Sequence, residues 1–257
     1  MKENWSIKKF RKTKFNNPIM IEGLPGMGNV GKIAVDFIIE SLDAEKVFEI
    51  TSSDFPNCVF VNDKGIIELP KIEIYYKKQK KNDLFIVSGD VQPPENKGSY
   101  EFCENLINLF SGYGGKQIIT LGGIGLEEIP RKPKVYCTGT DKKEINSYRE
   151  FGARSAVGVI GPIIGVSGLL VGIAKDKKIK GASLLVETYG HPTYLGIKEA
   201  RELLKIVNNS LKLGINIKKL DKEVKQIEME IKDKFEKITA LQDDKINYSN
   251  EHMNYIG

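Results

Sequence analysis

A glycine-rich turn between two apolar segments is the feature that most constrains this chain. The apolar run at residues 18–21 leads into the turn GLPGMGNVG at residues 23–31, and an amphipathic segment follows at residues 32–39. A short apolar run, clustered glycines and helical periodicity are typical of a strand, a tight turn and a helix. We therefore expect an α/β fold in which a strand turns sharply into a helix.

The same turn allows a nucleotide-binding interpretation. Gly26, Gly28 and Gly31 match the G-x-G-x-x-G pattern, whose glycines let the backbone approach a pyrophosphate, and Glu49 lies 18 residues further on, about where a ribose-binding acid belongs. Residues 58–88, however, contain four short apolar runs divided by turn residues, which is typical of hairpins rather than of crossover helices. We therefore favour the interpretation in which these glycines only let a helix turn tightly onto a sheet.

Two further glycine-rich regions carry a family resemblance. Residues 121–126 (LGGIGL) precede a proline-flanked basic turn and the run 135–140, and residues 161–174 precede the segment 180–190. Together with the turn at 23–31, these motifs resemble the archaeal branch of the proteasome assembly chaperone family, over about residues 18 to 215. The resemblance implies a central mixed sheet similar to that of purine nucleoside phosphorylases, without an established active site.

The C-terminal part has its own pattern. Beyond an amphipathic segment at about 193–212, a heptad stripe begins at Ile217 and ends at Leu241, with Lys234 as its one polar member. A strict stripe of this width is typical of a coiled coil or of a helix laid along a partner. An amphipathic helix folded back on its own domain is the alternative. We expect an α/β domain at 1–215, a helical arm at 216–246 and a flexible tail at 247–257.

The last three residues are the predicted partner-binding site. The resemblance implies a C-terminal motif of a hydrophobic residue, tyrosine and any residue, which inserts between α-subunits of the proteasome ring. This chain ends in Tyr255, Ile256 and Gly257, so its tyrosine is third from the end rather than penultimate. An aromatic anchor on a mobile tail still suits capture of a chain end by a partner, and a frayed terminus without a role is the alternative.

Charge and hydropathy indicate whether nucleic acid or a membrane is a partner. The net charge is +5, but the lysine clusters carry few interleaved aromatic residues, so we expect no nucleic-acid partner. The apolar run 157–174 is interrupted by glycines and by Pro162, which predicts a strand at 156–160 and a short buried helix through Leu169 rather than a membrane span.

Cysteine usage indicates the compartment. The spacing of Cys58, Cys103 and Cys137 matches neither a disulfide framework nor a zinc site, so we expect three buried thiols in a cytoplasmic protein.

Catalytic residues are sparse. With two histidines, no triad or metal site can be assembled, so no catalytic residue, metal or cofactor is expected. The remaining candidates are Glu187 and Thr188, Asp90, and an anion-binding turn that includes Gly123 and Gly125. They would serve the alternative function, a nucleotide- or phosphate-binding enzyme such as an ATP-grasp ligase or a phosphorylase-like hydrolase. We favour the interpretation that these are polar residues at strand ends, which cap the helices that follow.

The sequence thus predicts a non-catalytic assembly factor. By resemblance, it would be a homo-oligomer that presents its C-terminal tails to proteasome α-subunits. A pull-down of proteasome subunits would support this function, whereas binding of ATP, NAD or a nucleoside would favour the enzyme.

Overall fold

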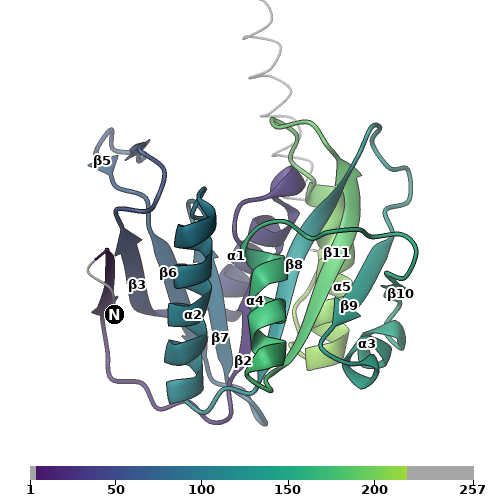
Figure 1. Ribbon diagram of the computed structural model, residues 1–257, viewed down its shortest axis with the longest axis horizontal. Coiled ribbons are helices and arrows are strands. Elements are labelled where there is room, and N and C mark those ends of the chain that lie inside the picture. The colour runs from purple at the N-terminus through teal and green to yellow at the C-terminus, as the bar shows by residue number, and fades with distance from the viewer. Residues whose placement is uncertain (1–3, 219–257) are drawn as a thin grey trace, which may run out of the picture. The chain divides into compact units, whose positions relative to one another are not determined.

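A nine-stranded mixed sheet lies at the centre of the α/β domain (Figure 1). The computed structural model describes residues 4–218, and residues up to Ile215 form one compact unit. A single α/β domain around a large mixed sheet is thereby confirmed. The strands are β1 (Trp5–Lys9), β2 (Ile19–Glu22), β3 (Glu45–Ser52), β4 (Phe60–Val61), β5 (Ile67–Glu68), β6 (Ile72–Lys77), β7 (Leu84–Gly89), β8 (Gln117–Leu126), β9 (Val135–Gly139), β10 (Arg154–Ser155) and β11 (Lys180–Tyr189). The helices are η1 (Met27–Asn29), α1 (Val30–Leu42), α2 (Asn96–Gly112), α3 (Lys142–Arg149), α4 (Val166–Asp176) and α5 (Ile197–Leu211).

Parallel strands form the middle of the sheet. The strand order is β1-β3-β6-β7-β2-β8-β11-β9-β10, and β7, β2, β8 and β11 run parallel to one another. All four residues of β2 are buried, as expected for a parallel strand that is covered on both faces. The apolar run at 18–21 therefore forms the strand that the sequence predicted, and this strand lies at the centre of the sheet.

Two helices cover each face of this parallel centre. Helices α2 and α4 pack together on one face, and α1 and α5 pack together on the other (Figure 1). The buried side of α5 carries Ala200, Leu203, Leu204 and Val207, and this spacing of three and four residues is that of one helix face. The helix begins at Ile197, later than predicted, because residues 191–193 form a turn.

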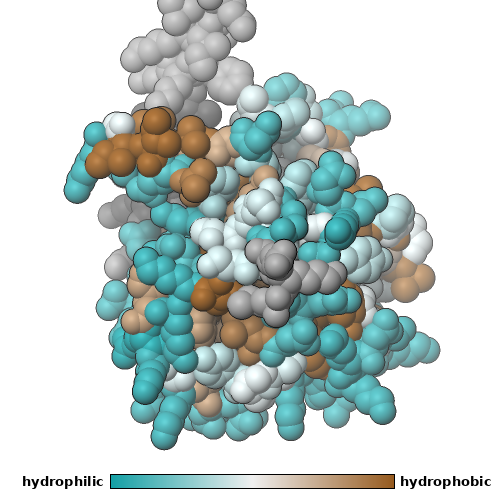
Figure 2. Space-filling model, turned by 60° about the vertical axis from the view of Figure 1, so that its left-hand side comes forward, coloured by the Kyte–Doolittle hydropathy of each residue, from teal (hydrophilic) through white to brown (hydrophobic). Residues whose placement is uncertain are grey.

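The predicted hairpins are present, but only one of them belongs to the main sheet. Strands β6 and β7 pair antiparallel within the main sheet, whereas β4 and β5 form a separate two-stranded sheet. This second hairpin projects from the end of the main sheet and carries an apolar patch (Figures 1 and 2).

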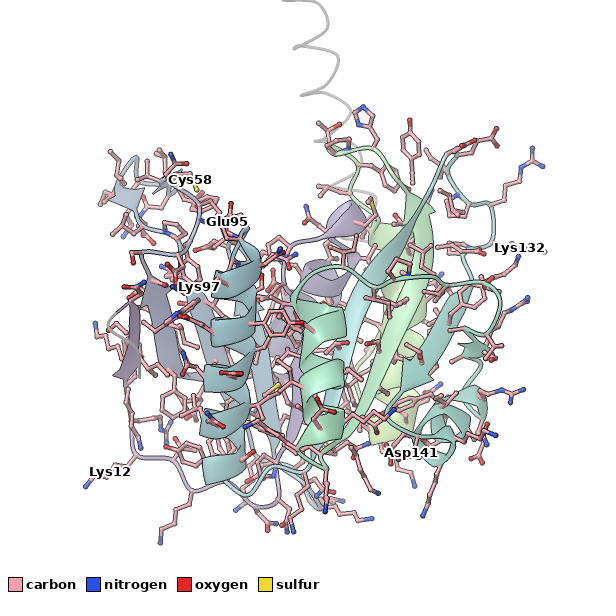
Figure 3. The ribbon with its side chains drawn as sticks, in the orientation of Figure 1. Lys12, Cys58, Glu95, Lys97, Lys132 and Asp141 are labelled. Carbon is pink, nitrogen blue, oxygen red and sulfur yellow. The ribbon has the colours of Figure 1, made fainter. Side chains whose placement is uncertain are left out.

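Two sequence predictions are wrong. Residues 156–160 form no strand: Val157 and Val159 lie in a turn and are 87% and 56% exposed, because Gly158 takes a positive φ of 75° that a strand does not allow. The helix that follows is α4, which begins at Val166 and continues past Leu169. Cys58 is exposed beside the β4–β5 hairpin (Figure 3), while Cys103 and Cys137 are buried as expected.

Other predictions lie outside the described residues or stay open. The heptad stripe lies beyond residue 218, apart from its first member, so the helical arm stays a prediction. The likeness to purine nucleoside phosphorylases stays a prediction as well. Among residues 4–218, no helix has the length and apolar character that crossing a bilayer requires.

The N-terminal segment forms strand β1 at one edge of the sheet, and it contributes to the core. Trp5 is 5% exposed, and its ring lies 5.6 Å from that of Phe55 and 5.7 Å from that of Phe102, centre to centre. Its indole N–H donates to Glu101 at 3.4 Å. Strand β1 is thus held to the domain by one aromatic side chain as well as by its pairing with β3.

We predict that Trp5→Ala lowers the free energy of unfolding by about 3–5 kcal/mol, the usual cost of removing a buried aromatic side chain. Urea unfolding of the full chain measures this. Lys8→Ala, at an exposed position of the same strand, should change stability by less than about 0.5 kcal/mol. Equal stability of both variants would show that β1 does not belong to the core.

Candidate functional site

The sheet has a topological switch point between β7 and β2. The chain leaves β2 through α1 toward β3, and it leaves the neighbouring strand β7 through α2 toward β8, on the opposite side of β2. In open α/β sheets, ligands bind in the crevice outside the carboxyl ends of such strands. The glycine turn at 23–31 follows β2 directly, so it lies where a ligand site is expected.

Protein atoms occupy the space around the first and the last glycine of this turn. A Cβ atom on Gly23 would collide with the carbonyl of Gly31, and one on Gly31 would collide with the carbonyl of Leu121 in β8. The first turn of α1 therefore lies directly on the sheet. This is the close helix–strand packing for which a glycine is needed.

The two predicted glycine motifs meet each other. Gly28 has a φ of +61°, and a Cβ atom built on it would lie 2.5 Å from the hydroxyl oxygen of Thr188 in β11. A Cβ atom on Gly123 would collide with the carbonyl of Met27, and one on Gly125 would lie 3.1 Å from the Met27 sulfur. The turn therefore packs directly against the glycines of β8. Gly26 is exposed, and a Cβ atom on it would meet nothing closer than the Gln92 side-chain nitrogen at 3.9 Å.

Gln92 joins the loops that surround the glycine turn. Its side-chain amide donates to the carbonyl of Pro25 at 2.5 Å and accepts from the backbone N–H of Val166 at 3.0 Å. The residue follows β7, Pro25 follows β2, and Val166 begins α4, so one side chain joins three loops. Sequence analysis missed Gln92, because no motif marks it and its partners are distant in sequence.

A buried carboxyl group lies beneath these loops. Glu22, the last residue of β2, is fully buried, and its Oε1 accepts from the Leu24 backbone N–H at 3.1 Å and the Ser167 hydroxyl at 3.3 Å. Its Oε2 has no hydrogen-bond partner among residues 4–218, and burial raises the pKa of Glu22 from 4.5 to about 7. The sequence signal that could have identified Glu22 is an acidic residue at the end of an otherwise apolar strand.

Hydroxyl groups continue this polar cluster toward the sheet. The Thr120 hydroxyl donates to the backbone carbonyl of Ser167 at 3.0 Å and lies 2.8 Å from the Ser183 hydroxyl. Strands β8 and β11 are thereby joined to the first turn of α4. The cluster fixes α4 on the sheet through these hydrogen bonds.

The predicted enzyme residues do not converge. Asp90 accepts from the backbone N–H of Lys71 at 3.1 Å, which ties β7 to β6. Glu187 accepts from the Tyr136 hydroxyl at 3.0 Å and pairs with Lys134, which ties β11 to β9. Because β2 and β8 lie between β7 and β11, Asp90 and Glu187 are separated by about 14 Å, three strand spacings. Within residues 4–218, no three metal-ligating side chains come together.

The remaining predicted positions have different outcomes. Glu49 forms an ion pair with Lys46 at 3.2 Å within β3, away from the glycine turn. The predicted partner-binding residues Tyr255, Ile256 and Gly257 lie outside the described residues. The geometry of the crevice therefore favours a structural role for its glycines, and a partner site has to be sought at the periphery of the domain.

Comparison with known proteins identifies the family. The PAC2 family model matches residues 20–234. This chain belongs to the PAC2 family. The membership confirms the resemblance that three glycine-rich motifs predicted, and the matched region contains all three.

Solved PAC2-like structures have the same fold. Pyrococcus furiosus PbaB, described as an archaeal proteasome activator, is 33% identical, with a TM-score of 0.82 over 91% of this chain and 99% of that one. Pyrococcus furiosus PbaA, described as an archaeal homolog of proteasome-assembly chaperone, is 24% identical, with a TM-score of 0.76 over 99% and 100%. An uncharacterised protein of Methanocaldococcus jannaschii is 33% identical over 68% of this chain and 67% of its own length.

We predict that Gly28→Ala destabilises this PAC2 protein by about 2 kcal/mol or more, because alanine in the left-handed region costs about 1–2 kcal/mol and the new methyl group also collides with Thr188. The matched control is Gly114→Ala, where φ is +79° but no atom lies within 4 Å, so only the backbone cost applies. Thermal and urea unfolding measure both. Saturable micromolar binding of ATP or NAD that is lost in Gly28→Ala would instead support the nucleotide-binding alternative.

A second prediction concerns the pH dependence of stability. Because the pKa of Glu22 is raised from 4.5 to about 7 in the fold, the wild type should lose stability as the pH rises through this window. Glu22→Gln keeps a neutral side chain with an acceptor for Leu24. The stability of Glu22→Gln relative to wild type should therefore increase by about 3 kcal/mol between pH 4.5 and pH 8.

Urea unfolding at a series of pH values measures this difference. As a control, Glu104→Gln removes a carboxyl group from an exposed position of α2 and should change stability by less than about 0.5 kcal/mol. A Glu22→Gln stability that parallels the wild type at every pH would show that the buried carboxyl group does not titrate in this window.

Proposed function

We propose that this PAC2 protein is a non-catalytic, cytoplasmic proteasome-binding factor of the assembly-chaperone or activator type. The observation that carries the proposal is the similarity to PbaB, the Pyrococcus furiosus proteasome activator, at 33% identity over nearly the whole of both chains. PbaA supports the fold and not the activity, because it is 24% identical.

The crevice is consistent with this function. The glycines that suggested a nucleotide site pack against Leu121, Met27 and Thr188, and Gln92 joins the surrounding loops. The polar residues of the enzyme alternative are spread across the sheet, where they make structural hydrogen bonds. A binding factor requires no such site, since its work is done by surfaces and chain ends.

The C-terminal tail is the proposed contact with the proteasome α-ring. We infer that the protein is a homo-oligomer, that residues 216–246 form a helical arm, and that Tyr255, Ile256 and Gly257 dock on α-subunits. One aromatic anchor on a tail supplies only a few kcal/mol once the cost of ordering the tail is subtracted. Useful affinity then depends on several tails of one oligomer that bind together.

We predict that deletion of Tyr255–Gly257 leaves the fold, the thermal midpoint and the oligomer size unchanged but weakens capture of proteasome α-subunits by at least tenfold, since avidity multiplies the loss at each tail. Surface binding at matched concentrations measures the affinity, with light scattering as the check on oligomer size.

Two substitutions sharpen this test. Tyr255→Ala should reproduce most of the loss, whereas Asn254→Ala, one position upstream of the proposed anchor, should bind as the wild type does. Undiminished capture by the truncated protein would contradict tail docking. No capture by the intact protein would contradict proteasome binding itself.

A further inference from the structure

Strand β1 leaves one side of its backbone without a neighbouring strand. It stands at the end of the strand order, and within residues 4–218 it pairs with β3 alone. The pairing is antiparallel and places Lys8 opposite Glu49, and the Phe10 N–H continues it by donating to the carbonyl of Val47 at 3.0 Å. In an antiparallel pair, alternate residues direct their N–H and C=O groups to opposite sides. Because Lys8 and Phe10 face β3, the backbone groups of Trp5, Ile7 and Lys9 point away from the sheet.

The side chains of β1 differ between its two faces. On one face, Trp5 is buried and Ile7 packs against the hydrophobic core. On the other face, Lys8 is exposed, and its Nζ lies 4.9 Å from the centre of the Phe10 ring. A strand added beside β1 would therefore meet an apolar row on one face and a lysine on the other.

Positive charge gathers around this edge. Residues 8–14 (KKFRKTK) contain four lysines, one arginine and no acid. Arg11 forms an ion pair with Glu45, whereas the four lysines have no ion pair within residues 4–218. The turn at 77–81 adds four more lysines, and Asn16 donates to its last backbone carbonyl at 3.4 Å. The edge strand thus continues into a basic end of the domain.

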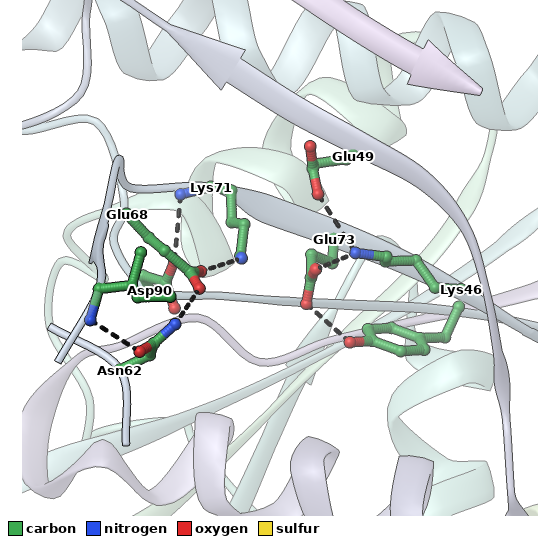
Figure 4. Close-up of polar contacts among 9 residues, drawn as sticks. Lys46, Glu49, Asn62, Glu68, Lys71, Glu73 and Asp90 are labelled. Carbon is green, nitrogen blue, oxygen red and sulfur yellow. Dashed lines mark hydrogen bonds and ion pairs between the residues drawn. The ribbon is translucent and has the colours of Figure 1, made fainter. Parts of the chain in front are cut away.

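Lysines further inside the same part of the sheet are neutralised by acids. Figure 4 shows Lys46 of β3 bound to Glu73 of β6 at 2.7 Å. It also shows Lys71 bound to Glu68 at 2.7 Å, and Glu68 accepts in addition from Asn62 in the turn of the β4–β5 hairpin. The lysines of β1 have no such acids beside them, so their charge is available to a partner.

Backbone and charge together indicate the kind of partner. A row of outward N–H and C=O groups is completed by an extended chain, and unpaired lysines attract acidic side chains. A second copy of β1 is disfavoured, because lysines would stand opposite lysines. Nucleic-acid bases stack on open aromatic rings, but the Phe10 ring has the Nζ atoms of Lys8 and Lys46 over it, at 4.9 Å and 4.7 Å. An acidic polypeptide in extended form fits both features.

We propose that β1 is a docking edge for an acidic, extended segment of a partner protein, which adds antiparallel to Trp5–Lys9. Acidic side chains of the segment stand opposite Lys8, in a non-hydrogen-bonded pair, where side chains on neighbouring strands are closest. Apolar side chains at the alternate positions extend the row of Trp5 and Ile7. This edge is distinct from the C-terminal residues of the proposed function, and the inference does not rest on proteasome binding.

A labelled peptide tests the charge requirement. A blocked peptide of alternating glutamate and valine, about ten residues long so that it spans β1, should give a saturable rise in fluorescence anisotropy with the full chain. The same peptide with lysine in place of glutamate should give none. Lys8→Glu should weaken binding by about tenfold. The control is Lys132→Glu, an equal change of charge between β8 and β9 across the sheet from β1 (Figure 3), which should weaken binding by less than about twofold.

N-methylated peptides test the backbone requirement. In the proposed register the valines direct their N–H groups toward β1, and the glutamates direct theirs to solvent. N-methylation of the valines should therefore abolish binding, whereas N-methylation of the glutamates should preserve it. Both peptides carry the same charge, so attraction between charges alone would not distinguish them.

Several results would overturn the proposal. They are the absence of saturable binding, equal binding by wild type and Lys8→Glu, and a methylation effect that is the same for both peptides or that falls on the glutamates. A single-stranded DNA oligonucleotide of the same charge provides the last comparison. If it bound as tightly as the acidic peptide, the edge would be a general polyanion site and not a site for strand addition.

Discussion

The arrangement of the domain depends on one close contact, between the first turn of α1 and strand β8. Gly31 lies against the carbonyl of Leu121, and Gly23 faces Gly31, so a side chain at either position would push the helix away from the sheet. The contact holds the intervening turn between β8 and β11. It also places the Gly28 carbonyl where the N–H of Gly196 donates to it at 2.8 Å, which sets the start of α5. Both helices of this face are therefore positioned through one turn.

That contact also determines where recognition can occur. In nucleotide-binding α/β proteins the glycine turn leaves space for a phosphate, whereas here Met27 and Thr188 take up the corresponding space. At the centre of the carboxyl edge the turn packs on β8 and β11, and Gly26 is the exposed one among the four glycines of the turn. The β4–β5 hairpin projects from the main sheet (Figure 1), and such an element suits the recognition of a large partner rather than of a small molecule.

Local features were predictable from the sequence, and long-range features were not. The strand, turn and helix around Gly28 follow from neighbouring residues, and so does the turn at Asn62. The apolar run after Ala156 gave a false strand, because hydropathy does not report the positive φ of Gly158. Gln92 and Glu22 become recognisable through partners more than sixty residues away. The exposure of Val61 depends on the hairpin leaving the main sheet, which no local pattern encodes.

The buried carboxyl group of Glu22 makes folding of this domain a proton-uptake reaction. Between pH 4.5 and about 7 the unfolded chain carries this group ionised and the folded chain carries it protonated. The proton has to come from the buffer, so the heat of unfolding measured in this range contains the ionisation enthalpy of the buffer. Calorimetry of the wild type in two buffers of different ionisation enthalpy would then yield different apparent enthalpies for the same transition.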